Sequence, residues 1–307
     1  MTTIEELRSH SVIEVLTEHR RIVLIMLLML MLYGAVIFEL IADWCKNGDD
    51  AHGFFVFALS LYLIYRKGDV LRSLPCEPSF AGFWILLASL GLLVLGSLGG
   101  EFFITRMSLL SAIVGLVVHF RGWKVVHALR FPLLFSLLMV PLPGIVYYQL
   151  VFPLQLLASR LAIVGLELLN LFPVIREGNL LFLPHYTLEV VEACSGVRSL
   201  MALLALALGF GYTLRTRKLS RVALSVLVVP LAILSNALRL VVQAIIVKYW
   251  GIDIGTGAWH QAAGLLTFMS AAVLLLVADR ILVSLERRCG TTFRTMSVVN
   301  PNPTVLS

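Results

Sequence analysis

Three residues in the C-terminal half of the chain have side chains suited to acyl transfer: Cys194, Arg239 and His260. A cysteine thiolate can attack a carbonyl carbon and form a thioester, while a cation stabilises the developing oxyanion and a histidine moves the proton. Arg239 is too basic to act as a general base, so hydrogen-bond donation or oxyanion stabilisation is its expected role, and His260 is better suited to shuttling the proton.

Three further residues lie next to this set in the sequence. Arg198 follows Cys194 by four residues, so on a helix it shares the thiol's face and can favour the thiolate. Asn236 precedes Arg239 by three residues and can orient the guanidinium or hold a substrate carbonyl. Ser195 directly follows Cys194. We treat Arg198, Asn236 and Ser195 as supporting candidates.

Each of these residues also has a plain structural explanation. A free cysteine is usually a small buried hydrophobe, and Arg198 would serve as an interfacial anchor. Arg239 would serve in an ion pair or in helix packing. Gly264 and Thr267 continue the face of His260 at i+4 and i+7, a small-residue stripe that permits close approach of a neighbouring helix.

The composition of the chain indicates a polytopic membrane protein. Of its 307 residues, 59% are hydrophobic and only 14% are charged, and the mean hydropathy is +0.94. These values leave too little polar surface for a soluble globule. The net charge of +6 is therefore expected to hold loops on the cytoplasmic side and not to bind nucleic acid. The four cysteines form no C-x-x-C pair, and no spacing suggests a metal site.

Apolar runs predict an all-α fold of about eight transmembrane helices. Most runs are long enough to cross a hydrocarbon core of roughly 30 Å. The runs span 22 to 42, 52 to 65, 80 to 98, 102 to 118, 125 to 142, 197 to 214, 222 to 247 and 260 to 284. They place an integral-membrane domain at 1–288 and a cytoplasmic polar tail at 289–307.

Clusters of Lys and Arg predict the orientation. Basic residues precede the first run, follow the second, separate the fourth from the fifth, and follow the sixth and the last, so they fall on one side. They are Arg20, Arg21, Arg66, Lys67, Arg72, Arg121, Lys124, Arg215, Arg217, Lys218, Arg287 and Arg288. Both termini are then expected in the cytoplasm.

The segment 145–193 is expected to form a small external cap between the fifth and sixth helices. Five crossings end outside, and the sixth must begin outside, so 145–171 is expected to be an outer-surface or re-entrant helix. This stretch carries Pro153, Arg160 and Glu167 in an apolar pattern. The alternation from Tyr186 to Val190 predicts a short strand or hairpin.

The spans also predict the depth of the chemical residues. Arg239 follows Arg221 by eighteen residues, about 27 Å along a helix, and is therefore expected near the outer face. His260 precedes Arg280 by twenty residues, about 30 Å, and is expected at the same level. Cys194, at the outer start of the sixth run, completes the set.

These residues belong to an ordered series of motifs that resembles the exosortase family, bacterial relatives of the archaeosortases. The resemblance covers most of the chain, and the Cys-Ser-Gly block followed by Asn-x-x-Arg and His is its most specific part. The motifs are His52-Gly53, Pro141-Leu142-Pro143, Arg176-Glu177-Gly178-Asn179, Glu192-Ala193-Cys194-Ser195-Gly196, Asn236-Ala237-Leu238-Arg239, and His260 with Gly264.

The resemblance implies a membrane cysteine transpeptidase or protease that cleaves C-terminal sorting signals of the PEP-CTERM type. It implies Cys194 as the acyl-thioester nucleophile, with Arg239 and His260 dividing the proton-donor and transition-state-stabilising roles. Related archaeal enzymes have a second Arg where His260 stands, so the family leaves the proton donor open. His52 matches by motif alone and is not assigned a catalytic role.

The implied setting is the bacterial inner membrane, with the active site on the periplasmic face. Implied partners are exported proteins with a sorting signal, membrane lipid, and an envelope glycolipid or polysaccharide as acceptor, with no cofactor. Hydrolysis and transfer stay open, because water or another nucleophile can resolve a thioester.

Two other classes stay open. The first is a polytopic transporter in which Arg198, Arg239 and His260 line a polar pathway. The second is a scaffold for exopolysaccharide assembly without peptidase activity.

Overall fold

A computed structural model describes the backbone of residues 2–46, 48, 50–171, 173–183, 186–189, 197–214, 218–250 and 257–298. The chain forms two compact units, which are described separately. Unit 1 comprises Met1–Gly53 and Ser60–Pro141, and unit 2 comprises Phe54–Leu59 and Leu142–Ser307.

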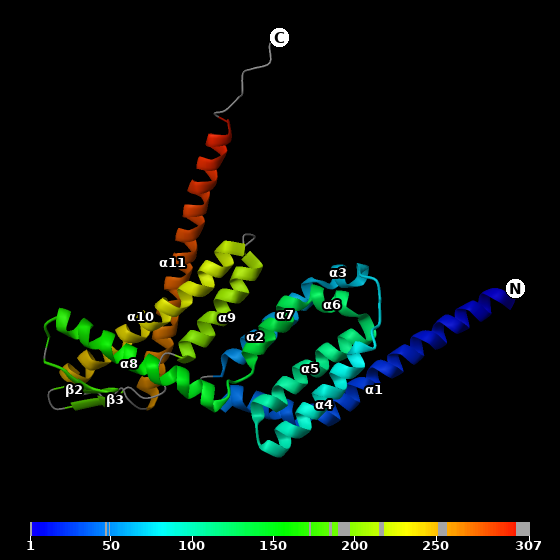
Figure 1. The fold of residues 1–307 in the computed structure, drawn as a ribbon, viewed down its shortest axis with the longest axis horizontal. Helices are drawn as coiled ribbons and strands as arrows, with labels where there is room; N and C mark the ends of the chain where they lie inside the picture. The colour runs from blue at the N-terminus through cyan, green and yellow to red at the C-terminus, as the bar shows by residue number, and fades with distance from the viewer. Residues whose placement is uncertain are drawn as a thin grey trace, which may run out of the picture. The chain divides into compact units, whose positions relative to one another are not determined.

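Unit 1 is built around a hairpin of two apolar helices. Its elements are α1 (Thr2–Lys46), most of α2 (His52–Arg66), α3 (Gly68–Ser73), α4 (Ala81–Gly99), α5 (Phe102–Arg121), α6 (Trp123–Ala128), α7 (Arg130–Phe135) and the 3₁₀ helix η1 (Ser136–Met139). Helices α4 and α5 lie side by side (Figure 1). A Cβ on Gly82 would stand 2.3 Å from the backbone nitrogen of His119, so this close approach requires glycine.

The exterior of the helices is apolar, as expected of a membrane protein. Large side chains such as Met31 and Leu98 are more than four-fifths exposed, and an extensive exposed apolar surface fits lipid contact. Six described helical segments are long and apolar enough to cross a membrane, and three shorter apolar helices accompany them. The predicted polytopic, helical fold class is confirmed.

The run 125–142, predicted as one crossing, is divided into α6, α7 and η1. The physical cause is Pro132, which has no backbone N–H to donate to the carbonyl of Ala128 four residues earlier. That carbonyl instead accepts a hydrogen bond from Nζ of Lys67. The prediction of a single helix was wrong here because mean hydropathy does not register a missing donor.

Unit 2 is centred on one long helix. Its elements are α8 (Gly144–Leu168), β1 (Ile175–Glu177), β2 (Leu180–Leu183), β3 (Tyr186–Glu189), α9 (Val197–Leu214), α10 (Lys218–Trp250) and α11 (Gly257–Val298). Helix α10 packs against α8, α9 and α11 (Figure 1). Its buried apolar residues divide between a core shared with α8 and β2 and a core shared with α9 and α11.

The stretch 145–171, predicted to be an outer-surface or re-entrant segment, contains one 25-residue helix, α8. Pro153 lies inside this helix, and Arg160 and Glu167 are exposed, while Ala162 and Leu166 face the core. By length and composition α8 is a candidate membrane span. Its depth in the membrane therefore stays a prediction.

A small antiparallel sheet follows α8 in the order β1-β2-β3. The β1–β2 turn contains Gly178 at φ 63°, a left-handed conformation that glycine adopts without strain. The Gly178 carbonyl accepts hydrogen bonds from Oγ of Ser159 at 3.3 Å and from Nη1 of Arg176 at 2.8 Å. The predicted strand beginning at Tyr186 is confirmed as β3, which pairs with β2.

Candidate functional site

The central side chains of the candidate site lie on α10. Asn236 and Arg239 are buried, with relative exposures of 2% and 8%, within a helix whose other residues are mostly apolar. A charge inside a membrane helix is costly and usually marks a functional position or a compensated pair. Both side chains have interaction partners in the fold.

Contacts between α10 and α11 place Arg239 beside the first turns of α11. Oγ of Ser235 donates to the carbonyl of Thr267 at 3.1 Å and lies 3.0 Å from Oγ of Ser270. One turn further along α10, Nη1 of Arg239 lies 3.9 Å from the position that a Cβ on Gly264 would occupy. Side chains of α10 therefore reach the α11 backbone at Thr267 and lie beside Gly264, while close helix approach at Gly264 stays a prediction.

His260 lies one helical turn before Gly264 in α11, which begins at Gly257. Its backbone is helical, and its side chain lies outside the described residues. The approach of the Arg239 guanidinium to Gly264 thus brings α10 to within one turn of the His260 position on the chain.

The antiparallel pair α9–α10 aligns the start of α9 with the same part of α10. A Cβ on Gly211 would stand 3.7 Å from Cα of Arg221. Fourteen residues before Gly211 is Val197, the first residue of α9, and fourteen residues after Arg221 is Ser235. The first residue of α9 is therefore level with Ser235, and Arg239 lies about one turn beyond the start of α9.

The structure does not describe the side-chain positions of the remaining candidates. Cys194 and Ser195 lie outside the described residues, and α9 begins three residues after Cys194. Arg198 lies in the first turn of α9, but its side chain is not described. Within the described part of the chain, no group of three His, Cys, Asp or Glu residues could hold a metal ion.

Comparison with known families identifies the chain. A family model described as "Transmembrane exosortase (Exosortase_EpsH)" matches residues 44–277. The chain belongs to the transmembrane exosortase family. The family is generally one of cysteine transpeptidases that process PEP-CTERM proteins, and the predicted resemblance is confirmed. No curated protein and no solved structure matches this exosortase.

Gln243 is a buried polar residue of the exosortase that was not predicted from the sequence. It is 2% exposed and follows Arg239 by four residues, so Asn236, Arg239 and Gln243 form one polar stripe along α10. The signal available in the sequence was this i, i+3, i+7 spacing in an apolar helix.

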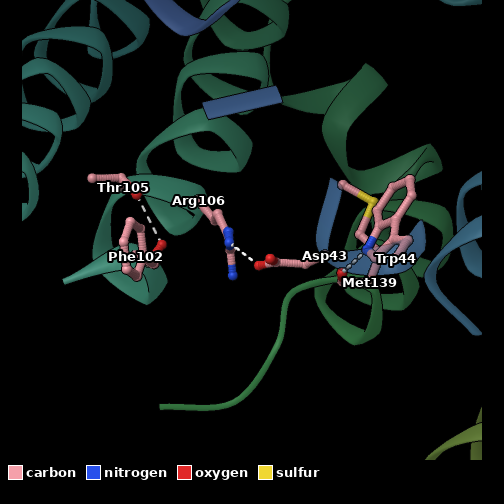
Figure 2. A network of polar contacts seen from close by, with 6 residues as sticks. All are labelled: Asp43, Trp44, Phe102, Thr105, Arg106 and Met139. Atoms are coloured by element: carbon pink, nitrogen blue, oxygen red, sulfur yellow. Dashed lines mark hydrogen bonds and ion pairs between the residues drawn. The ribbon is translucent and has the colours of Figure 1, made fainter. Parts of the chain in front are cut away.

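The motif residue His52 has a structural environment in unit 1. Its Nε2 lies 3.0 Å from the carbonyl of Leu138, and Nε1 of Trp44 donates to the next carbonyl, that of Met139, at 3.0 Å. Figure 2 shows the Trp44 bond together with an ion pair between Arg106 and Asp43. These contacts fix η1 and its surroundings, consistent with the absence of a catalytic assignment for His52.

Proposed function

We propose that this exosortase cleaves C-terminal sorting signals of exported proteins through an acyl-thioester on Cys194. The observation that carries the proposal is the buried guanidinium of Arg239, which lies against α11 one turn from His260 and about one turn beyond the level of the start of α9. The signals are expected to be PEP-CTERM-like, as family membership implies.

The burial of Arg239 favours a role in stabilising negative charge. In a site with little water, a guanidinium interacts with a developing oxyanion more strongly than it would in bulk solvent. An arginine cannot accept a proton at physiological pH, so Arg239 contributes charge and donated hydrogen bonds only. His260 is the group of the three that can exchange a proton near neutral pH.

The proposed reaction consists of acylation of Cys194 followed by deacylation. The Cys194 thiolate attacks the scissile carbonyl, and Arg239 stabilises the oxyanion as the C–S bond forms. The C–N bond then breaks, and the leaving amine takes a proton, for which His260 is the proposed donor. Water or an envelope amine next attacks the thioester and releases the processed protein.

The charge pattern supports the proposed orientation in the membrane. The family is one of multi-pass membrane proteins, the basic clusters favour cytoplasmic termini, and the inner membrane is the setting that the family resemblance implies. A substrate tail that ends in basic residues would adopt the same orientation and would present its cleavage motif at the periplasmic face. Exported proteins are the proposed substrates, and a glycolipid or polysaccharide is a proposed acceptor.

Processing of a tagged substrate tests this function. The substrate carries a Pro-Glu-Pro-like motif, a membrane helix and a basic end, and is coexpressed with wild-type enzyme, Cys194→Ala or Cys45→Ala. Cys45 is an exposed cysteine of unit 1 and provides the matched control. We expect the shorter product with wild-type enzyme and Cys45→Ala, and none with Cys194→Ala at equal membrane abundance. Equal processing by Cys194→Ala would overturn the assignment and favour a transporter or a scaffold.

A further inference from the structure

Gln243 is a buried amide for which the described part of the structure provides no hydrogen-bond donor at its oxygen. The side chain is 2% exposed, and no described group donates to Oε1. Arg239 precedes Gln243 by one turn on the same helix, yet its guanidinium is not bonded to this oxygen. Buried amide oxygens are nearly always hydrogen-bonded, so Oε1 is suited to a donor that belongs to the functional site.

The register of α10 and α11 indicates where that donor lies. Ser235 contacts Thr267 and Ser270, and Arg239 contacts the Gly264 position. Each turn toward the C-terminus of α10 thus corresponds to about one turn toward the N-terminus of α11. Residues 235, 239 and 243 follow one another at i+4 along one side of α10. One turn beyond the Arg239–Gly264 pair, the same register brings the Gln243 position opposite the His260 position.

We propose that Gln243 is a positioning residue whose Oε1 accepts a hydrogen bond from the imidazole N–H of His260. A neutral imidazole has one N–H donor and one acceptor nitrogen. A bond from the N–H to Gln243 fixes the tautomer and the ring orientation, and leaves the other nitrogen directed at the reaction. This inference rests on the proposed function of His260.

The first test separates this role from packing by steady-state kinetics. Full-length enzyme in lipid vesicles processes a synthetic peptide with the sorting signal. Gln243→Met keeps the length of the side chain but removes the acceptor, whereas Gln243→Glu keeps an acceptor oxygen. Gln155→Met is the matched control, since Gln155 is a buried glutamine of α8, 6% exposed, with no assigned role.

We expect Gln243→Met to lower kcat by about 10- to 100-fold with little change in KM, as for other residues that orient a reactive group. Gln243→Glu should retain most of kcat, and Gln155→Met should match the wild type. A wild-type kcat for Gln243→Met overturns the proposal. A raised KM with unchanged kcat also overturns it, because Gln243 would then bind substrate.

The second test asks whether Gln243 acts through His260. The rate at which iodoacetamide alkylates Cys194, followed by mass spectrometry of that peptide, reports the thiolate without any turnover. We expect Gln243→Met to change this rate in the same direction as His260→Ala, and to have no further effect in the His260→Ala background. Independent effects of the two substitutions overturn the proposal.

The two proposals fail in different ways. If Cys194→Ala processes substrate, the proposed function fails, while the alkylation experiment still tests the Gln243–His260 pair. If Cys194→Ala is inactive and Gln243→Met behaves as the wild type, only the role of Gln243 is lost.

Discussion

At the scale of single residues, two buried arginines of this exosortase differ in their surroundings. Arg106 in unit 1 is 5% exposed and forms an ion pair with Asp43 (Figure 2). Such a pair is explained by structure alone, because it compensates the cost of the buried charge. Arg239 in unit 2 also has interaction partners, lies beside Gly264 next to the turn that carries His260, and is the arginine proposed to act in catalysis.

Replacing Arg239 tests its role directly. Arg239→Gln should lower processing at least about 100-fold, as loss of one oxyanion donor does elsewhere. Arg239→Lys should keep part of the activity, because lysine retains the charge but lacks the planar fork of donors. Both rates are measured by product formation at matched membrane abundance.

Arg160→Gln is the control for this prediction, because Arg160 is an exposed arginine of the same unit. It should process substrate normally. Normal processing by Arg239→Gln would contradict a catalytic role for the guanidinium.

The sequence predicted the candidate residues but not their full environment. Residue type alone identifies Cys, Arg and His as candidate catalytic groups. Helical spacing predicted that Gly264 would permit close packing. Gln243 could not be recognised in the same way. An amide in an apolar helix becomes informative only when the structure shows that it is buried and that no described group donates a hydrogen bond to its oxygen.

At the scale of elements, the contact between α10 and α11 determines where the guanidinium can lie. A Cβ at position 264 would stand 3.9 Å from Nη1 of Arg239, an ordinary van der Waals distance. Gly264→Ala should therefore process substrate within about threefold of the wild type, a change of less than ~1 kcal/mol. Gly264→Leu should displace the guanidinium and reduce kcat at least about tenfold.

The paired variants are compared in the same kinetic assay, with thermal melting as a check on folding. Equal activity of Gly264→Leu and Gly264→Ala would show that the position of Arg239 against α11 does not matter.

In unit 1, a glycine lets α2 approach the Trp44 ring. A Cβ on Gly53 would lie 2.3 Å from Nε1 of Trp44, the atom that donates to the Met139 carbonyl. Gly53→Ala should move the ring, break this bond, and lower stability by roughly 1–3 kcal/mol through overpacking.

The control for this substitution is Gly34→Ala in α1, where an added Cβ would have no neighbour within 4 Å. It should leave the melting temperature unchanged or raise it slightly, because alanine favours the helix. A melting temperature for Gly53→Ala equal to that of Gly34→Ala would contradict the proposed contact.

Hydropathy predicted the long helices but not where the chain breaks. Helices α4, α5, α10 and α11 follow from uninterrupted apolar runs. In 125–142 the interruption depends on Pro132 and on the hydrogen bond from Lys67 to Ala128, a contact between residues distant in sequence. In 145–171 the expected outer-surface or re-entrant helix is present as one continuous helix, α8, with Arg160 and Glu167 exposed, and its depth in the membrane stays a prediction.

At the scale of the whole molecule, these differences leave the proposed orientation consistent. The segment 125–142 was expected to provide the fifth crossing, whereas α8 now has the length for it. Either one alone gives five crossings before the sheet and Cys194. If α2 crosses as well, Cys194 is expected at the outer face in both arrangements, and the expectation would reverse if 125–142 and α8 both cross.

Single-cysteine labelling in spheroplasts tests this orientation. Asn179→Cys, in the β1–β2 turn, should react with a membrane-impermeant maleimide in intact spheroplasts. Ser73→Cys, at the end of α3 beside the basic residues Arg66, Lys67 and Arg72, should react only after permeabilisation. The reverse pattern would contradict the orientation and place the sheet in the cytoplasm.

The most direct measurement of the central claim is a search for the acyl-thioester. Wild-type enzyme is incubated with a sorting-signal peptide and quenched in acid, and the Cys194 peptide is then analysed by mass spectrometry. We predict a hydroxylamine-sensitive adduct with the mass of the N-terminal substrate fragment on Cys194, which also forms in Cys45→Ala and is reduced in Arg239→Gln. Substrate cleavage by Cys194→Ala at the wild-type rate, or an adduct on another residue that turns over, would contradict catalysis through a thioester on Cys194.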